Sequence, residues 1–285
     1  MRWRWVCAAV LFVPLAAQAE MPSEANIKAV ANAWLAKKPA PGFGATMTMA
    51  EAARVQERYT ALIAKDLGSV VGYKAGLTNP AVQKRFNYDR PLRGTLYEKM
   101  ILQTGARLPA AYGARPVFEA DMMAVVGDAA KLMAAKSPLD ALGALKEVRL
   151  FIELPDLVLD PQVKLDGPHL LGINVGARLG VLGGPIALPA TPDSVANLAT
   201  MKVELVDQNG AVLGGGKGSD VLDNPLNAAL WIADSLRAEG KTLKNGDLLS
   251  LGSFSALIPP KPGMTVTARY TGLTAAPAEV KVTFE

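Results

Sequence analysis

The apolar residues near the start of the chain recur at the spacing of one helix face. They are Ile27, Val30, Ala31, Trp34 and Leu35. This period predicts a first helix that ends at the proline- and glycine-containing segment 39–42. Thr48 followed by Glu51 forms a capping box that begins a second helix, and Gly68 is a natural stop for it. We therefore predict a small helical N-terminal region over residues 20–69.

From residue 70 onward the hydrophobic period shortens to that of strands. Runs rich in Val, Ile, Leu and Phe predict strands over residues 70–75, 117–126, 148–154, 203–206, 211–213, 248–251, 265–270 and 279–284. Residues 207–210, Asp-Gln-Asn-Gly, lie between two of these strands and are typical of a hairpin turn. A Lys-Pro-Gly turn at 261–263 precedes the last two strands.

One further helix is well marked near residue 225. Asn224 is a suitable N-terminal cap, Pro225 fits the first turn, and Gly240 lies just past the end. Because the strands do not alternate regularly with helices, a doubly wound sheet is disfavoured. The pattern predicts the α+β class, a mixed and β-rich fold, with one catalytic domain over residues 70–285.

The first 19 residues have the composition of a secretory signal peptide. Arg2 and Arg4 supply the positive start, the uncharged segment 5–17 follows, and Ala17-Gln18-Ala19 presents small residues at the cleavage positions. Pro14 interrupts a run that is already short for a membrane span. We predict a signal peptide over residues 1–19 and a periplasmic protein without stable membrane insertion. An uncleaved anchor is the alternative.

Loss of this segment changes what the composition implies. Cys7 is the only cysteine, so the mature chain would contain no disulfide, thiol nucleophile or cysteine metal ligand, which suits an oxidising compartment. Without Arg2 and Arg4, 28 of the 30 basic residues face 26 acidic ones. These charges are scattered, so we expect no nucleic-acid partner.

Three carboxylates occur inside apolar strand patterns. Glu119 and Asp121 lie two residues apart, so they point to one strand face with Cα atoms roughly 6.6 Å apart. Glu153 lies in a similar apolar run, Phe-Ile-Glu-Leu. Buried carboxylates repel one another and are costly to desolvate, and a hard divalent cation would relieve both penalties. The alternative is a solvated sheet face with unpaired acids.

Other polar residues have weaker patterns. Lys74, in an apolar strand flanked by glycines, fits a desolvated acid–base group or an anion clamp; the alternative is an edge-strand lysine that discourages aggregation. His169 is the only histidine and has no nucleophile motif near it, so we interpret it as a loop residue. The glycine-rich segment 214–218 lacks the spacing of a phosphate-binding loop.

Several segments, in order, resemble the 2-keto-4-pentenoate hydratase family of the fumarylacetoacetate hydrolase superfamily. The likeness runs from about residue 70 to the C-terminus. Its blocks are Gly72-Tyr73-Lys74-Ala75-Gly76-Leu77-Thr78, Ala81-Val82-Gln83-Lys84, Gly94-Thr95-Leu96-Tyr97, Pro116 to Asp121 (the family's P-x-x-E-A-E), Gly183-Gly184-Pro185, the segment 224–229 with Trp231, Gly246-Asp247 and Lys261-Pro262-Gly263.

The resemblance implies a fumarylacetoacetate hydrolase-like roll or sandwich and an enzyme, a hydro-lyase of aromatic-compound degradation. It implies Mg²⁺ or Mn²⁺ held by Glu119, Asp121 and Glu153, chelating a small-molecule 2-oxo acid. The metal would stabilise the enolate of a 2-hydroxy-2,4-dienoate to which water then adds. Lys74 would transfer protons or hold the substrate carboxylate, and Asn174 would orient substrate or water. We also expect a homo-oligomer.

Some positions differ from the family pattern. Asp121 replaces a glutamate and Asn224 a common histidine, Ile173 stands where an aspartate precedes Asn174, and Leu251 stands where a threonine precedes Gly252. Three alternatives therefore stay open: a 2-oxo acid decarboxylase, a C–C hydrolase of the same superfamily, and a periplasmic 2-oxo-acid-binding protein without catalysis. The absence of a histidine next to the predicted site argues against the C–C hydrolase.

Overall fold

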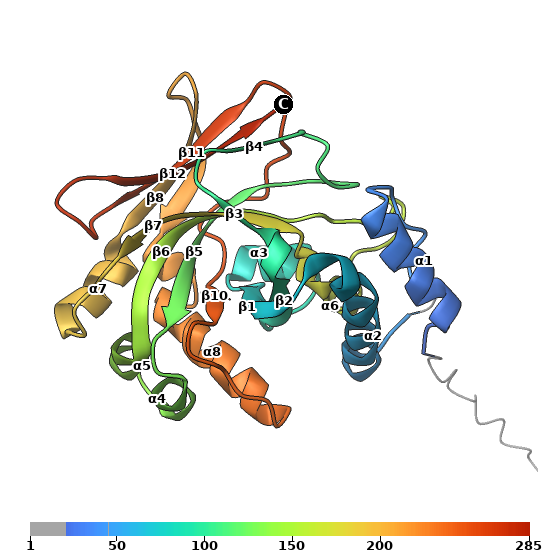
Figure 1. The fold of residues 1–285 in the computed structure, drawn as a ribbon, viewed down its shortest axis with the longest axis horizontal. Helices are drawn as coiled ribbons and strands as arrows, with labels where there is room; N and C mark the ends of the chain where they lie inside the picture. Colours follow the sequence, from blue (N-terminus) through green and yellow to red (C-terminus); the bar gives the residue numbers. More distant parts are fainter. Residues whose placement is uncertain (1–20, 45) are drawn as a thin grey trace, which may run out of the picture.

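The computed structural model describes residues 21–44 and 46–285, so the predicted signal peptide lies outside the described residues. Two sheets form the centre of the molecule, and helices gather at its ends (Figure 1). The predicted mixed, β-rich α+β class is confirmed. Along the described chain, no helix combines the length and the apolar character that crossing a membrane requires.

The larger sheet has seven strands and the smaller one five. The larger sheet, in spatial order, consists of β2 (Leu92–Tyr97), β1 (Val70–Gly76), β10 (Leu248–Ser250), β5 (Glu119–Val126), β6 (Leu145–Leu154), β7 (Leu179–Ile186) and β3 (Ile101–Gln103). The smaller sheet consists of β4 (Ala106–Leu108), β12 (Ala278–Phe284), β11 (Thr265–Thr271), β8 (Lys202–Asp207) and β9 (Val212–Lys217).

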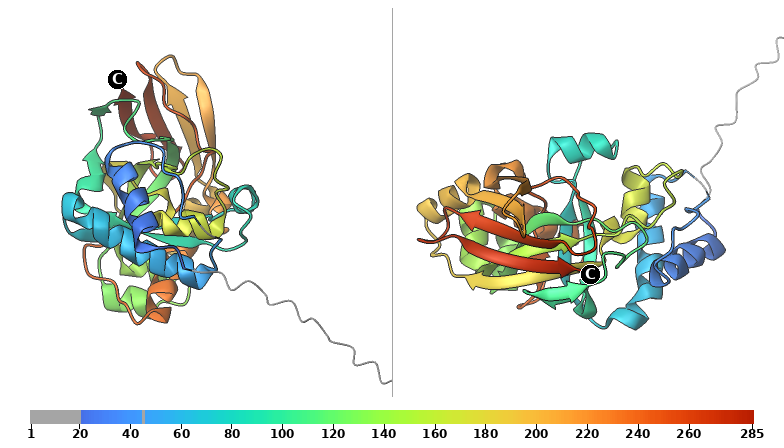
Figure 2. Two further views of the ribbon diagram at one scale, coloured as in Figure 1. Left: turned by 90° about the vertical axis from the view of Figure 1, so that its right-hand side faces the viewer. Right: turned by 90° about the horizontal axis from the view of Figure 1, so that it is seen from above.

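Helices cover the exposed parts of these sheets. They are α1 (Glu24–Leu35), α2 (Met49–Leu67), α3 (Pro80–Arg85), α4 (Ala129–Ala134), α5 (Pro138–Ala144), α6 (Gly167–Gly172), α7 (Pro192–Thr200) and α8 (Pro225–Ala238), with short 3-10 segments η1 (Glu98–Met100), η2 (Asn174–Gly176) and η3 (Gly218–Asp220). Figure 1 shows α1, α2 and α6 at one end of the molecule and the smaller sheet at the other. In the view from above in Figure 2, α3 projects from the body.

The seven-stranded sheet separates two hydrophobic cores. On one face, Ala120, Met122 and Ala124 of β5 pack with α8 and the smaller sheet. On the other face, Met123 of β5 and Phe151 of β6 pack with α1, α2 and α6. Every residue of β5 is buried, which agrees with its near-continuous apolar sequence. Polar side chains on this strand must therefore find partners inside the protein.

The strongest local signals were predicted correctly. Thr48 and Glu51 form the expected capping box at α2, Asn224 caps α8, and the turn at 207–210 joins β8 to β9 in an antiparallel pair. Strand β5 begins at Glu119, two residues later than predicted, because Phe118 pairs in an isolated bridge with Ile258 instead. The other predicted strands agree with β1, β6, β8, β10, β11 and β12, whereas β9 extends well beyond the predicted 211–213.

The strand that we did not predict on the far side of β6 is rich in glycine. In β7, a Cβ atom added to Gly180 would lie 2.0 Å from the ring of Phe151, so only glycine allows this aromatic side chain to pack against the strand. From the sequence, these glycines are indistinguishable from turn residues. Strand β2 was missed because it is short and contains Arg93 and Gly94.

Candidate active site

The lysine and the three carboxylates predicted from the sequence meet on one face of the seven-stranded sheet. Glu119 on β5 is the direct cross-strand partner of Glu153 on β6, and Asp121 follows on the same face of β5. On the other side, Lys74 on β1 pairs in register with Ser250 on β10, which lies next to β5. This is the face on which the N-terminal helices pack.

Lys74 is buried among these acids. Its side chain is 4% exposed and forms an ion pair with Glu153, and its Nζ donates a hydrogen bond to the carbonyl oxygen of Val175 at 3.1 Å. Strand β1 lies inside the sheet, since β2 covers its outer edge. The alternative of an exposed edge-strand lysine is therefore wrong.

The carboxylates are buried as well, so the alternative of a solvated acidic face is also wrong. Glu119, Asp121 and Glu153 are 8%, 0% and 2% exposed. Asp121 is held by protein donors: the Ser250 hydroxyl donates to its Oδ2 at 2.6 Å, and the Gly252 amide donates to its Oδ1 at 3.0 Å. One lysine thus faces three buried acids, and the cluster is rich in potential negative charge.

Burial and mutual repulsion shift the pKa values of this cluster. Burial, together with the neighbouring Glu153, raises the pKa of Glu119 well above its usual range. The same causes raise the pKa of Asp121 to about 7, although its hydrogen bonds from Ser250 and Gly252 oppose the shift. For Lys74, burial alone would lower the pKa, but attraction to Glu153 and Glu119 raises it. The ammonium form of Lys74 is therefore favoured.

The chemistry of this donor set fits a hard divalent cation, because carboxylate oxygens are its preferred ligands. The arrangement is not a ready metal cage, however. Within residues 21–44 and 46–285, no three Asp, Glu, His or Cys side chains stand where they would hold a metal together. In this arrangement the ammonium of Lys74 pairs with Glu153, and Ser250 and Gly252 donate hydrogen bonds to Asp121.

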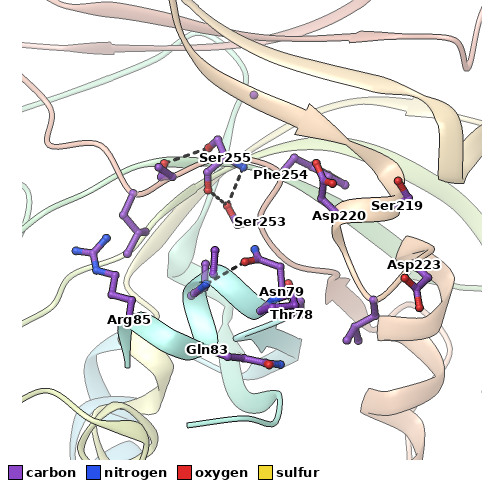
Figure 3. Close-up of a pocket in the computed structure, with 17 residues that line it drawn as sticks. Thr78, Asn79, Gln83, Arg85, Ser219, Asp220, Asp223, Ser253, Phe254 and Ser255 are labelled. Carbon is purple, nitrogen blue, oxygen red and sulfur yellow. Dashed lines mark hydrogen bonds between the residues drawn. The ribbon is translucent and has the colours of Figure 1, made fainter. Parts of the chain in front are cut away.

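Two connected cavities lead from the surface to this cluster. The inner cavity, about 40 Å³, is lined by Lys74 and Glu119 together with apolar side chains of α6 and the loop after β6. The outer cavity, about 790 Å³, lies between α3, the segment 219–223 and the loop after β10 (Figure 3). Both cavities share the lining residues Thr78, Asn79, Val82, Ser253 and Leu257. A small anion that enters through the outer cavity therefore passes these residues on its way to Lys74.

Asn174 lies beside the cluster but does not point its amide into the cavity as expected. Its Nδ2 donates to the Thr95 carbonyl at 2.8 Å and its Oδ1 accepts from the Thr95 amide at 2.8 Å. Gln56 of α2 also donates to Oδ1, at 3.3 Å. The amide is thus engaged with the backbone of β2, and the role of Asn174 in orienting substrate or water stays a prediction.

His169 is the one predicted loop residue that the structure corrects. It lies in α6, where its Nδ1 is 2.7 Å from Oδ1 of Asp166, the helix cap. Its ring stacks on Phe43. The glycine-rich segment 214–218 lies largely in β9, and Gly215 allows β9 to approach the backbone of β8. Neither feature contributes a nucleophile or a phosphate loop.

The sequence did not reveal the groups that support the site, which are Asp156 next to the loop before β5 and the hydrogen-bond donors to Asp121. Asp156 is 1% exposed, accepts hydrogen bonds from the amides of Ala114 and Arg115, and pairs with Arg178. It thereby fixes the loop that leads into β5. The available signal was a second acid three residues after Glu153 in the same apolar run. Ser250 and Gly252 had no signal, because their partner Asp121 is about 130 residues away in the chain.

Comparison with known proteins decides the family. No protein-family model matches the sequence. The chain is 33% identical over 217 residues to the 2-keto-4-pentenoate hydratase of Burkholderia vietnamiensis, which covers 75% of this chain and 78% of that protein. The chain belongs to the 2-keto-4-pentenoate hydratase family. The predicted resemblance is confirmed, and so is the prediction of a hydratase-like lyase.

Other members of the superfamily share the fold. The chain is 26% identical to the 4-oxalocrotonate decarboxylase of a Pseudomonas species over 80% of this chain and 83% of that protein. The 4-oxalocrotonate decarboxylase of Pseudomonas putida G7, complexed with magnesium and adipate, superposes with a TM-score of 0.78 at 24% identity, covering 92% of this chain and 97% of that chain. The predicted fumarylacetoacetate hydrolase-like fold is confirmed.

Three of the four positions at which the chain differs from the family pattern, Ile173, Leu251 and Asn224, have structural roles. Ile173 and Leu251 are 1% and 0% exposed and belong to the two hydrophobic cores. Asn224 caps α8 through Oδ1 and donates from Nδ2 to the Val195 carbonyl at 2.9 Å. These side chains pack within the protein and do not replace any group of the lysine–carboxylate cluster.

Proposed function

We propose that the protein adds water to a 2-hydroxy-2,4-dienoate, the enol form of a 2-oxo-4-enoate, in the periplasm. The observation that carries this proposal is a buried ammonium, Lys74, facing Glu119, Asp121 and Glu153 at the base of an accessible cavity. Buried groups with strongly shifted pKa values are expected at sites of proton transfer. The hydratase relatives support the same reaction.

Lys74 is the candidate proton-transfer group. As the dienol ketonises, its hydroxyl loses a proton and its carbon chain gains one. Lys74 lines the inner cavity and is held by Val175 and Glu153, so it can hold or move a proton there while its charge attracts an anionic substrate. The apolar walls of the inner cavity exclude bulk water, which strengthens these electrostatic interactions.

We further propose that Glu119, Asp121 and Glu153 hold Mg²⁺ or Mn²⁺ during the reaction. A bound divalent cation would supply positive charge for the carboxylate and keto oxygens of a 2-oxo acid. The decarboxylase neighbour that was solved with magnesium supports a metal in this fold. Glu153, which pairs with Lys74 in the metal-free site, would then share its charge between the cation and the ammonium.

Decarboxylation is the second candidate, and it is favoured by the 4-oxalocrotonate decarboxylase likeness. Both reactions pass through an enolate, so the cluster alone does not separate them. A C–C hydrolase is disfavoured because the only histidine is engaged with Asp166 in α6. A binding protein without catalysis is less well supported, because the relatives at 32–33% identity are hydratases.

One assay separates these functions. The mature protein is given 2-hydroxypenta-2,4-dienoate with Mg²⁺ or with a chelator, and both the dienol absorbance and carbon dioxide are followed. A hydratase shows metal-dependent loss of absorbance without carbon dioxide. If 4-oxalocrotonate is consumed with release of carbon dioxide while the dienoate is not hydrated, the protein is a decarboxylase. Metal-dependent binding without turnover of either compound identifies a binding protein.

A further inference from the structure

The inner cavity has few polar side chains, so the protein groups left for a substrate can be identified. They are Lys74, Thr78, Asn79, Glu119 and Ser253. The Ser253 hydroxyl donates to the carbonyl of Ser255 at 2.7 Å and accepts from the Ser255 amide. Its proton is therefore already used within the loop after β10.

Thr78 differs from Ser253 in having no hydrogen-bond partner for its hydroxyl among the described residues. It is 3% exposed, and it lines both the inner and the outer cavity. A hydroxyl that opens onto a cavity without a protein partner can donate to a ligand there. Since its free donor faces a cavity, the missing partner belongs to a ligand in that cavity or to water.

Asn79 supplies a second free donor at the same place. Its Oδ1 accepts from the Val82 amide at 2.9 Å and so caps α3. This contact fixes which amide atom is the oxygen and leaves Nδ2 without a partner in the described residues. Figure 3 shows Thr78 and Asn79 on one side of the cavity, across from Ser253.

The backbone at this point is held in an unfavourable conformation. Leu77 has a φ of 57°, a left-handed value that is unfavourable for leucine. Gln83 donates to the Leu77 carbonyl at 3.0 Å, and the Leu222 amide donates to the Thr78 carbonyl at 3.1 Å. Such strain persists where surrounding contacts over-determine it, commonly at functional sites. Here it turns Thr78 and Asn79 toward the cavity.

Gly252 links this turn to the carboxylate cluster. A Cβ atom at Gly252 would lie 2.3 Å from the Thr78 hydroxyl oxygen, and its φ is 116°, so only glycine accommodates the threonine. The amide of the same glycine donates to Asp121. The Thr78 hydroxyl therefore lies against Gly252, whose amide holds the proposed metal ligand Asp121.

We propose that Thr78 and Asn79 bind the carboxylate of the 2-oxo acid substrate, Thr78 through its hydroxyl and Asn79 through Nδ2. This inference rests on the proposed function, which makes the ligand a 2-oxo acid. A carboxylate accepts several hydrogen bonds and gains most from donors in a buried site. Bound in this way, the carboxylate anchors the substrate at the neck of the inner cavity and directs its keto group toward Lys74.

The test measures binding of pyruvate by calorimetry in the presence of Mg²⁺, and KM and kcat with 2-hydroxypenta-2,4-dienoate. Thr78→Val keeps the shape and removes the donor, so it should weaken pyruvate binding and raise KM by roughly 10- to 100-fold, the value of a hydrogen bond to a charged group. Thr78→Ser keeps the donor and should stay within about threefold of the parent. Asn79→Asp keeps the helix cap but presents an acceptor, so it should also weaken binding.

Thr60→Val is the matched control. Thr60 is also buried, but its hydroxyl donates to the Gln56 carbonyl in α2 at 2.7 Å, so this variant should bind pyruvate like the parent. If Thr78→Val does not fold, the other two variants decide. The two-donor site is overturned if Asn79→Asp binds pyruvate like the parent. It is also overturned if Thr78→Ser is folded but loses much more than threefold in pyruvate affinity.

The outcomes separate this inference from the proposed function. Parent-like pyruvate binding and turnover in Thr78→Val overturn the carboxylate site and leave the hydratase intact. A parent that binds pyruvate without hydrating the dienoate, with binding lost in Thr78→Val, keeps the carboxylate site and overturns the hydratase. A parent that binds no pyruvate with Mg²⁺ overturns the carboxylate site, and a parent that in addition leaves the dienoate unhydrated overturns both.

Discussion

Lys74 balances the charge of buried Glu153 and is also the proposed proton-transfer group. Two variants report on these two roles. Lys74→Ala leaves Glu153 buried and unpaired, so we expect about 3–5 kcal/mol of lost stability together with about a 10²–10⁴-fold fall in kcat. Adding Glu153→Gln removes the uncompensated charge. The double variant should therefore regain stability in urea unfolding. The catalytic role is measured in the single variant: a kcat of Lys74→Ala equal to that of the parent would remove Lys74 from the mechanism.

At the scale of elements, the turn at η2 sets the position of Lys74. Val175 is β-branched and has a φ of 55°, and its carbonyl accepts from Lys74. A Cβ atom at Gly76 would lie 2.4 Å from Cγ1 of Val175. Gly76→Ala should therefore displace the η2 turn and with it the carbonyl that holds Lys74, which lowers kcat. It should also cost about 1–3 kcal/mol in stability, as overpacking does.

The rescue of this defect is specific. Val175→Ala removes the methyl group that the new side chain would meet, so Gly76→Ala with Val175→Ala should recover both the melting temperature and kcat. Gly184→Ala is the matched control, because a Cβ atom there meets nothing within 4 Å. A double variant no better than Gly76→Ala alone would show that the contact does not position Lys74.

How far the sequence predicts each element depends on how local its cause is. Helices α2 and α8 were predicted from caps within a few residues, and the three acids stood out because they interrupt apolar strand patterns. Strand β7 was missed because its Gly180 is required by contact with Phe151, which lies on another strand. The hydrogen bonds between Asn174 and Thr95 were missed for the same reason, since the two residues lie 79 positions apart.

At the scale of the whole molecule, metal binding should change how stability depends on pH. Burial raises the pKa of Asp121 from 3.8 to about 7 and that of Glu119 well above its usual value. Between about pH 4 and 7 the metal-free folded state thus binds more protons than the unfolded state, and its stability falls as pH rises through this window. A bound cation replaces these protons.

Thermal unfolding with Mg²⁺ or with a chelator checks this. The rise in melting temperature caused by Mg²⁺ should be larger at pH 7.5 than at pH 5.5, and at fixed pH it should grow with the logarithm of Mg²⁺ concentration above the dissociation constant. Glu153→Gln should shrink the response. An unchanged melting temperature of the parent protein in both Mg²⁺ and Mn²⁺ would contradict the metal site.

The cellular location is a prediction for the whole chain. We expect export and cleavage after Ala19, because of the positive start, the apolar run and the small residues of 17–19. Intact-mass measurement of protein from a periplasmic extract should give a chain that begins at Glu20. Full-length protein recovered only from the cytosolic fraction would contradict both the cleavage and the location.

Strand β10 has a consequence for how the protein is made. It contains three residues, yet it lies between β1 and β5 in the larger sheet, and its Ser250 reaches Asp121 across 129 positions of sequence. During synthesis, the strand that lies between β1 and β5 is therefore missing until residues 248–250 have been made. Pairing across such sequence distances is slow. If the chain is exported as we predict, its lysine and acids come together only after residues 248–250 have been made and have joined the sheet.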